Sequence, residues 1–333
     1  DAPAGVLARN ALPHVFDPLL VQAALAGVTE RIGLVATVST TYLPPYHLAR
    51  KFATLDHLSG GRSGWNLVTS GSEFEARAFG LPHQLEHAER YKIAHEYMKV
   101  VRGLWDTWED DAFLLDKQKN WFFDPEKLHR ICHQGLKFNV EGGLQAPRLP
   151  QGYPVLVQAG SSSDGQDLAA ATAELVFTAQ QTVEDARAFY ASLKSRLPVW
   201  GRSEDDLKIL PGVSPFVGRS ESEAREKFEQ LQDLIDPVLG VGLLSAFLGN
   251  IDLSAYPIDG PFPVDLPVGE GWKSRHALFN KLAQRDNLSI RDLYKRVATG
   301  RGHWTLVGTP ESIADEIEHW FTTGAADGFN ILS

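Results

Sequence analysis

Cysteine is almost absent from this sequence, because Cys132 is the single one in 333 residues. One thiol cannot form an intramolecular disulfide, and it leaves no set of cysteines that could hold a structural zinc ion. Nothing around Cys132 indicates a nucleophile pocket, so we interpret it as an idle or buried thiol. Without a disulfide framework, we expect an intracellular, cytoplasmic protein.

Long apolar runs and basic stripes are missing as well. No uninterrupted apolar segment approaches the roughly 20 residues that a membrane-spanning helix needs, so we expect no membrane as a partner. Lysine and arginine total 32 against 42 aspartates and glutamates, which gives a formal net charge of −10. This balance argues against nucleic acid as the main partner.

Alternating helix and strand patterns are what the sequence does contain. Continuous apolar runs, typical of strands buried on both faces, predict strands at residues 32–39, 63–69, 154–159, 174–178, 208–217 and 327–332. Helical patterns predict helices at residues 18–29, 47–58, 87–105, 182–197, 220–234 and 309–324, and one that begins near residue 165. This alternation indicates an α/β fold, a parallel sheet covered by helices.

The fold that we favour is a (β/α)₈ TIM barrel, for which six predicted strands are two too few. Residues 1–5 have the composition of a loop and residues 327–332 that of a core strand, so we expect the chain to lack the first strands and a C-terminal segment. An open doubly wound sheet is the less favoured alternative, because no glycine-rich dinucleotide turn follows a predicted strand. We interpret residues 1–333 as one domain with insertions at 108–150 and 236–302.

Hydroxyl and amide side chains follow the predicted strands, at the end where a β/α barrel builds its active site. They include Thr37, Asn66, Ser161 and Ser162. No carboxylate pair suited to hydrolysis accompanies them, and no cluster of histidines and acids has the spacing of metal ligands. We therefore expect no metal, and a large polar cofactor that brings its own chemistry.

The turn at residues 159–165, AGSSSDG, joins a predicted strand to a predicted helix. Its small residues let backbone N–H groups and the helix N-terminus face an anion, and its serines add hydroxyl donors. It is a candidate phosphate cradle, although an ordinary serine and glycine loop explains it equally well. His87 and Tyr91 lie four residues apart on one helical face and can meet the same ligand; a solvated helix surface is the alternative.

Motifs along the chain resemble one branch of the bacterial-luciferase-like flavin-dependent monooxygenases, which includes nitrilotriacetate, dibenzothiophene-sulfone and long-chain alkane monooxygenases. The first are IGLVAT at residues 32–37, STTY at 39–42, PYHLAR at 45–50, LDHLSGGR at 55–62 and WNLVTS at 65–70. The others are HAERY at 87–91, FNV at 138–140, PQG at 150–152, QAGS at 158–161, VGTPE at 307–311 and AADGF at 325–329. Their combination is specific for the branch but not for a substrate.

The resemblance implies a TIM barrel, noncovalently bound reduced FMN, O₂ as co-substrate and a separate flavin reductase that supplies the reduced FMN. The FMN contacts that it implies by position are Thr37, His87, Tyr91, Ser161 and Ser162. Asn66 is similar to a barrel-interior residue beside the flavin. The family's first two strands, which carry an FMN-binding aspartate, have no counterpart in this sequence.

The reaction implied is transfer of one oxygen atom from O₂ to a small organic substrate. We expect residues 236–302 to form a lid and pocket wall, and their aromatic content favours a hydrophobic or sulfur-containing substrate. The aromatics that could line this pocket, or only pack the loop, are Phe247, Tyr256, Phe262, Trp272 and Phe279. His303, predicted to lie in a loop, is the candidate catalytic residue, and His276 is a weaker one; a lone loop histidine is more often only solvated.

Three other functions stay open at this point. The same superfamily includes deazaflavin-dependent oxidoreductases, which differ in the reduced cofactor that supports turnover. A non-catalytic protein would bind FMN and oxidise nothing, and a metal-dependent barrel hydrolase would be sensitive to chelators. Because soluble assemblies are usually symmetric, we expect a homodimer or homotetramer.

Overall fold

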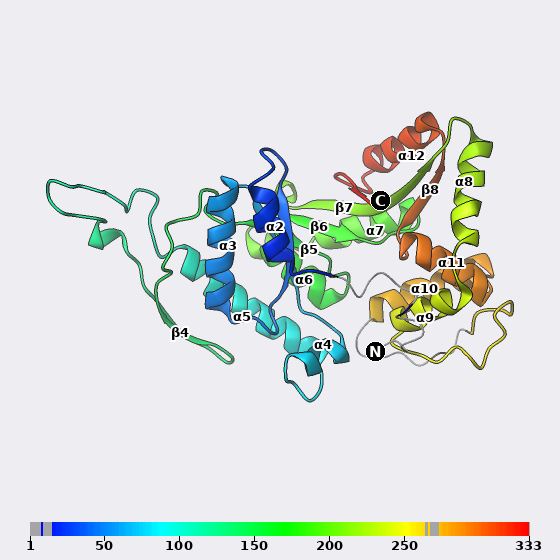
Figure 1. Cartoon of the computed structure of the whole chain (residues 1–333), viewed down its shortest axis with the longest axis horizontal. Coiled ribbons are helices and arrows are strands. Elements are labelled where there is room, and N and C mark those ends of the chain that lie inside the picture. Colours follow the sequence, from blue (N-terminus) through cyan, green and yellow to red (C-terminus); the bar gives the residue numbers. More distant parts are fainter. Residues whose placement is uncertain (1–7, 9–14, 264–265, 267–272, 333) are drawn as a thin grey trace.

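The computed structural model describes residues 8, 15–263, 266 and 273–332, and its centre is a parallel sheet (Figure 1). The strands of this sheet are β1 (Leu34–Ser39), β2 (Ser63–Val68), β5 (Val155–Gln158), β6 (Leu175–Thr178), β7 (Lys208–Val217), β8 (Trp304–Gly308) and β9 (Asn330–Ile331). Their order is β1-β2-β5-β6-β7-β8, β9 also pairs with β7, and every pairing is parallel. Helices connect the parallel strands, which is the α/β arrangement of a TIM barrel, as predicted.

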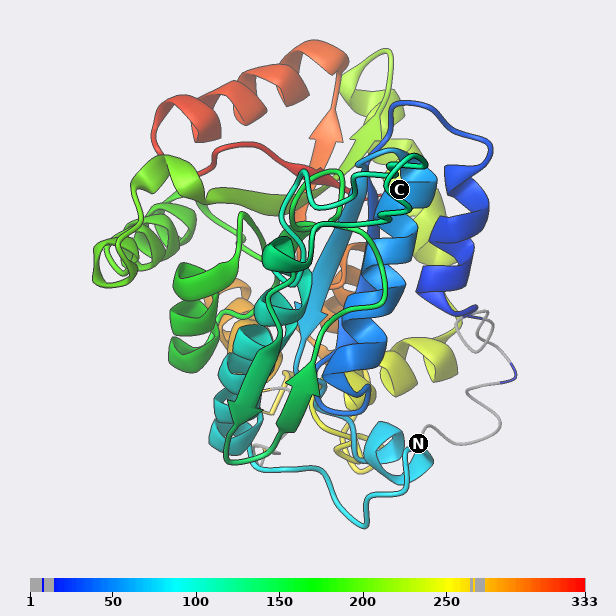
Figure 2. The ribbon, with the colours of Figure 1, turned by 90° about the vertical axis from the view of Figure 1, so that its left-hand side faces the viewer.

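Helices cover the outside of the sheet (Figure 2). Those that follow or precede its strands are α2 (Pro18–Ala26), α3 (Pro45–Ser59), α4 (Glu73–Ala78), α5 (His87–Trp105), α6 (Ser163–Thr172), α7 (Val183–Lys194), α8 (Glu221–Asp233) and α12 (Pro310–Thr322). The predicted helix starts are confirmed in detail: Asp17 accepts a hydrogen bond from the backbone N–H of Leu20, and Thr182 and Ser220 cap α7 and α8. Short 3₁₀ helices span Pro125–Lys127, Leu197–Trp200 and Glu204–Asp206.

Side chains alternate between the two faces of the sheet. Leu34, Trp65 and Leu156 lie in a hydrophobic core shared with residues of α3 and α5. Because successive residues of a strand point to opposite faces, Thr37 and Asn66 face the barrel interior. The polar side chains therefore lie inside the barrel, and the packing against the helices is apolar.

The strand β8 is missing from the sequence analysis, although His303 itself lies in a bend directly before this strand, as predicted. Trp304 is the first residue of this strand and pairs with Val213 of β7. Glycines at positions 300 and 302 precede the strand, and its apolar run is short, so the sequence carries mostly turn signals there. The six predicted strands are all present, and with the unpredicted β8 they make up the seven strands of the sheet.

The insertion at residues 108–150 forms an arm that extends away from the barrel (Figure 1). It contains a two-stranded antiparallel hairpin of β3 (Ile131–Gln134) and β4 (Asn139–Gly142), which the sequence analysis describes only as irregular. Cys132 lies on β3 and is exposed, so it is not a buried thiol.

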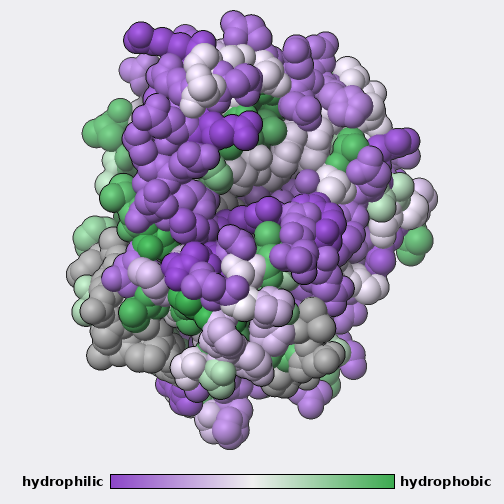
Figure 3. All heavy atoms as spheres, turned by 90° about the vertical axis from the view of Figure 1, so that its right-hand side faces the viewer, coloured by the Kyte–Doolittle hydropathy of each residue, from purple (hydrophilic) through white to green (hydrophobic). Residues whose placement is uncertain are grey.

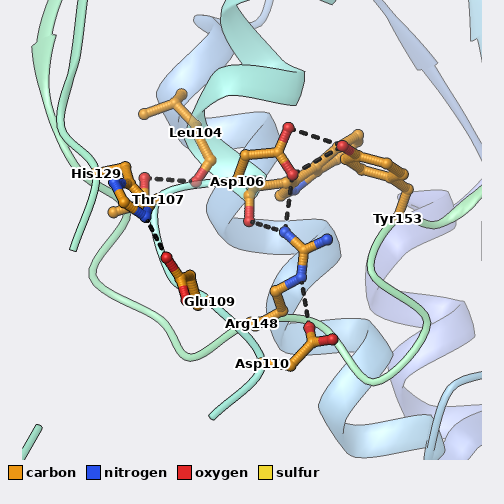
Figure 4. A network of polar contacts seen from close by, with 9 residues as sticks. Leu104, Asp106, Thr107, Glu109, Asp110, His129, Arg148 and Tyr153 are labelled. Atoms are coloured by element: carbon orange, nitrogen blue, oxygen red, sulfur yellow. Dashed lines mark hydrogen bonds and ion pairs between the residues drawn. The ribbon is translucent and has the colours of Figure 1, made fainter. Parts of the chain in front are cut away.

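Arg148 fastens the end of this arm to the barrel (Figure 4). Its Nη1 lies 2.7 Å from Asp106 Oδ1, just beyond α5, and its Nε lies 2.8 Å from Asp110 Oδ1. The hydroxyl of Tyr153 donates to the same Asp106 carboxylate at 2.7 Å. One guanidinium thus joins the two ends of the arm.

We expect Arg148→Met to loosen the arm while the barrel stays folded. The acids that Arg148 contacts are 47% (Asp106) and 89% (Asp110) exposed, so the loss of stability should be about 1 kcal/mol or less. Limited proteolysis should show faster cleavage within residues 108–150, with little change in the thermal unfolding midpoint. Equal cleavage rates in the variant and the wild type would show that Arg148 does not hold the arm.

The insertion at residues 236–302 is a helical unit with a hydrophobic core of its own. It comprises α9 (Pro237–Phe247), α10 (Lys273–Asp286) and α11 (Ile290–Gly300). Phe262 and Phe279 are buried in this core and Phe247 packs against it, whereas Tyr256 is 41% exposed. Phe247, Phe262 and Phe279 therefore pack the insertion together, and neither they nor Tyr256 line the two cavities described below. Trp272 lies outside the described residues. The face that carries this insertion is largely hydrophilic, with separate hydrophobic spots (Figure 3).

Candidate functional site

A cavity of about 400 Å³ opens at the C-terminal ends of β1, β2 and β5. Its lining residues are Thr37, Leu67, Val68, Thr69, Ser70, Gly71, Ser72, Glu75, Tyr91, Gln158, Ala159, Gly160 and Leu168. We call it the first cavity. It combines hydroxyls and backbone groups with apolar walls, which suits a ligand that has both a flat apolar part and polar substituents.

The 159–165 turn closes one end of the first cavity. Ser162 is the N-cap of α6, and its hydroxyl accepts a hydrogen bond from Gly165 N–H at 3.1 Å. A Cβ at Gly160 would lie 2.9 Å from Gly165 Cα and 3.2 Å from Tyr91 Oη, so only glycine allows this close approach. The turn therefore brings the N-terminus of α6 and the Tyr91 hydroxyl together, as an anion site requires.

A second helix N-terminus lies at the same turn. His87 is the first residue of α5, and its Nδ1 lies 3.2 Å from Asp164 Oδ2 in the first turn of α6. The rings of His87 and Tyr91 lie 4.8 Å apart, so the predicted pairing on one helical face is confirmed. The N-termini of α5 and α6 thus meet at the turn where the sequence predicts a phosphate cradle, and His87, which lines neither cavity, pairs there with Asp164.

Thr37 and Asn66 lie side by side on β1 and β2. They are register partners, and Asn66 Nδ2 donates to Thr37 Oγ1 at 3.0 Å. Thr37 lines the first cavity, but Asn66 does not, and its Oδ1 accepts no hydrogen bond from the described part of the chain. Asn66 therefore orients the Thr37 hydroxyl, which is the group that a ligand in the cavity can reach.

A second cavity of about 520 Å³ lies on the other side of the β5 end and shares Ala159 with the first. Its lining residues are Ala159, Ser161, Phe177, Thr178, Ala179, Gln180, Asp185, Phe189, Ala277, Leu278, Lys281 and His303. Ser161, which we predict to contact phosphate, lies on this side of the turn. The two cavities are separated by small residues, so that ligands in them would be neighbours.

His303 lies in a loop as predicted, but it is 5% exposed and lines the second cavity, so it is not a solvated residue. Its ring stacks on Phe177 at 4.7 Å with an interplanar angle of 22°. A Cβ at Gly212 would lie 2.5 Å from His303 Nδ1 and 2.7 Å from Phe177 Cε2. Glycine at position 212 therefore makes room for the stacked pair, with Nδ1 against the β7 backbone.

The weaker candidate, His276, lines neither cavity. It is buried on α10, where its Nδ1 lies 3.2 Å from the Asn280 amide. Within the described ranges, no group of three or more histidines, cysteines or acids could hold a metal ion. No helix of the described residues is long and apolar enough to cross a membrane.

Several residues that line the two cavities were not predicted from the sequence. Glu75 of α4 contributes a carboxyl group to the first cavity, and burial raises its pKa despite a hydrogen bond with Ser70. Ala277, Leu278 and Lys281 of α10 line the second cavity although the helix lies more than 100 residues from β5 in the sequence. A lone glutamate or an ordinary helix face carries no signal that could have found them.

Comparison with known proteins agrees with this geometry. The model of the luciferase-like monooxygenase family matches residues 5–327. The chain is 51% identical to the N-acetyl-S-(2-succino)cysteine monooxygenase of Bacillus subtilis, over 95% of this chain and 72% of that protein. It is also 51% identical to component A of the nitrilotriacetate monooxygenase of Aminobacter aminovorans, over 96% of this chain and 70% of that protein.

A solved structure supports the same assignment. A riboflavin lyase, crystallised with modified FMN and its substrate riboflavin, superposes with a TM-score of 0.84. It shares 34% identity, and the match covers 95% of this chain and 69% of that one. The chain therefore belongs to the luciferase-like monooxygenase family, in the branch that its sequence motifs resemble.

Proposed function

We propose that this chain is the oxygenase component of a two-component monooxygenase that uses reduced FMN and O₂. The observation that carries the proposal is the first cavity, which joins an anion-binding turn to a partly apolar space of about 400 Å³ at the C-terminal ends of barrel strands. FMN has the matching parts, a phosphate and a flat ring system. Bound reduced FMN would supply the electrons that activate O₂.

The residues present fit this group. The cradle made by Gly160 and Gly165 leaves no room for a Cβ. Ser162 caps the N–H groups of Gly165 and Gln166, so the N–H groups of Ser163 and Asp164 at the start of α6 are the ones that could face an anion. We propose that Ser161, Ser162 and Tyr91 hold the phosphate and that His87 contributes a polar contact beside them. The hydroxyl of Thr37, oriented by Asn66, would meet the ring system. The apolar walls would exclude water, which would otherwise allow the oxidant to react without oxidising the substrate.

The partners follow from the same proposal. The relative from Aminobacter is named a component, which supports a system in which another protein takes part. We propose a separate flavin reductase as that partner, and a homodimer or homotetramer as the assembly.

The substrate class can be narrowed from the relatives that share 51% identity. Nitrilotriacetate and N-acetyl-S-(2-succino)cysteine are small molecules with several carboxylates, and the second is a thioether. We propose a carboxylated amine or thioether as substrate. This keeps the sulfur-containing class expected from the sequence and replaces its purely hydrophobic alternative.

We expect Gly160→Ala to weaken FMN binding by about 10- to 100-fold. The new Cβ would meet Gly165 Cα at 2.9 Å, and the backbone shift that relieves this overpacking, at a cost of about 1–3 kcal/mol, would move the turn away from the phosphate. Titration with FMN and with riboflavin, which lacks the phosphate, separates the causes. A smaller loss for riboflavin supports the phosphate assignment, and an equal loss for both would contradict it.

Anaerobic titration with reduced FMN, followed by a pulse of ¹⁸O₂ and a candidate substrate, tests the function directly. We expect tight binding of reduced FMN and one ¹⁸O atom in the product. Turnover with a reduced deazaflavin instead would identify the deazaflavin-dependent alternative. FMN binding with no oxygenation of any compound in a broad screen would identify a flavin-binding protein.

A further inference from the structure

The second cavity contains one ion pair, between α10 and α7. Lys281 Nζ lies 2.6 Å from Asp185 Oδ1, and both residues line the cavity. Among its described lining residues, Lys281 is the only lysine or arginine and Asp185 is the only acid. The pair is accessible, with 62% of the lysine side chain and 34% of the aspartate side chain exposed. A ligand that enters the cavity can therefore reach both charges.

The two partners do not depend on each other equally. Asp185 lies in the first turn of α7, where the helix dipole stabilises a negative charge without Lys281. Lys281 precedes the last turn of α10, where a helix would favour its charge. A ligand carboxylate can thus replace Asp185 at the ammonium group, and Asp185 stays stabilised by its helix.

The rest of the cavity suits a small organic acid. Thr178 and Gln180 offer neutral polar groups, and Gln180 Nε2 donates to Thr178 Oγ1 at 2.9 Å, so that the threonine hydroxyl can donate to a ligand. Phe177 and Phe189 provide apolar surface for a carbon or thioether skeleton. The shared residue Ala159 places such a ligand next to the first cavity.

We infer that the second cavity is the substrate site and that Lys281 selects the substrate by binding one of its carboxylates in exchange for Asp185. This inference rests on the proposed function, which places the flavin in the first cavity. Lys281 is then a specificity-determining residue supplied by the insertion at residues 236–302. The insertion contributes to the site through one face of α10, and its aromatic core only supports that face.

Two variants with opposite expected effects test this role. Calorimetric titration of the FMN-loaded protein uses N-acetyl-S-(2-succino)cysteine as the probe and its trimethyl ester as the uncharged control. We expect Lys281→Met to weaken binding of the acid by about three- to tenfold and Asp185→Asn to strengthen it by a similar factor. Lys281→Arg should retain most of the affinity, and the ester should respond little to any of these changes.

The alternative role of the pair, a purely structural clasp between α10 and α7, gives a different pattern. A clasp would make Lys281→Met and Asp185→Asn weaken binding together, for the acid and the ester alike, which would overturn the inference. Wild-type protein that binds the ester as tightly as the acid, or binds FMN but not the acid, would also overturn it. Failure of the wild type to bind FMN at all would instead contradict the proposed function.

Discussion

Replacing Lys194 with methionine is expected to destabilise the fold by about 3–5 kcal/mol. Lys194 is 4% exposed, and its Nζ donates to the backbone carbonyls of Glu204 at 2.6 Å and Leu207 at 2.5 Å. The same nitrogen lies 3.1 Å from Asp327 Oδ2. Loss of the ammonium group would leave the largely buried Asp327 carboxylate without its cation and two carbonyls without their donor.

Asp327 connects this network to residues that are distant in the sequence. Its carboxylate accepts hydrogen bonds from the Tyr190 hydroxyl at 2.9 Å and from the N–H of Ile209 at 2.8 Å. Burial, together with the hydrogen bond to Asp327, raises the pKa of Tyr190 to about 12, so the phenol stays protonated as a donor. The network therefore ties α7, β7 and the segment before β9 to one another.

Equilibrium unfolding in urea measures the predicted loss. Lys227→Met is the matched control, because Lys227 forms an exposed pair with Glu223 outside this network and its replacement should change stability by no more than about 0.5 kcal/mol. A double-mutant cycle between Lys194→Met and Asp327→Asn should show strong coupling. If Lys194→Met cost no more than the control, the buried pair would not stabilise the fold.

Replacing His303 with asparagine is expected to lower turnover by about 10²–10⁴-fold, the range for a residue that transfers a proton in the reaction. The ring is held by its stack on Phe177 and by the room that Gly212 leaves, so asparagine removes the imidazole without filling the cavity. His303 also borders the second cavity, where we place the substrate. We expect His303 to act as a positioned acid or base at that wall.

Single-turnover kinetics with substrate and reduced FMN measure this effect on the chemical step. The affinity for FMN should change little, because His303 does not line the first cavity. His129→Asn is the control, since His129 is exposed on the arm and pairs with Glu109. Unchanged turnover would remove His303 from the mechanism.

Most helices and strands could be predicted because their signals are local. The helix at residues 87–105 is predicted at the same bounds that the structure has, and Asp17 and Ser220 cap as expected. The strand β8 could not be predicted, because turn residues precede it and its stability comes from pairing with β7, which is distant in the chain. The role of the aromatics in residues 236–302 could not be predicted either. Their hydrophobic pattern does not tell whether they line a pocket or pack against one another.

Some motifs of the resemblance turn out to stabilise the barrel. Asp56, in the LDHLSGGR segment, is fully buried and accepts hydrogen bonds from the Ser63 hydroxyl at 2.7 Å and from the Gln151 amide at 2.5 Å. It joins α3 to β2 and to the PQG segment before β5. The motif at residues 55–62 and the one at 150–152 are therefore two halves of one contact, which only the folded chain brings together.

The sequence by itself determined the alternation of strands and helices, the family and the glycine and serine turn, since each depends on neighbouring residues. Only the tertiary structure decided which distant side chains share a cavity. Thr37, Tyr91 and Gly160 meet at the first cavity, and Lys281 and His303 meet at the second. The physical reason is that a parallel barrel gathers strand ends that are far apart in the chain, and side-chain packing then decides which residues face the space between them.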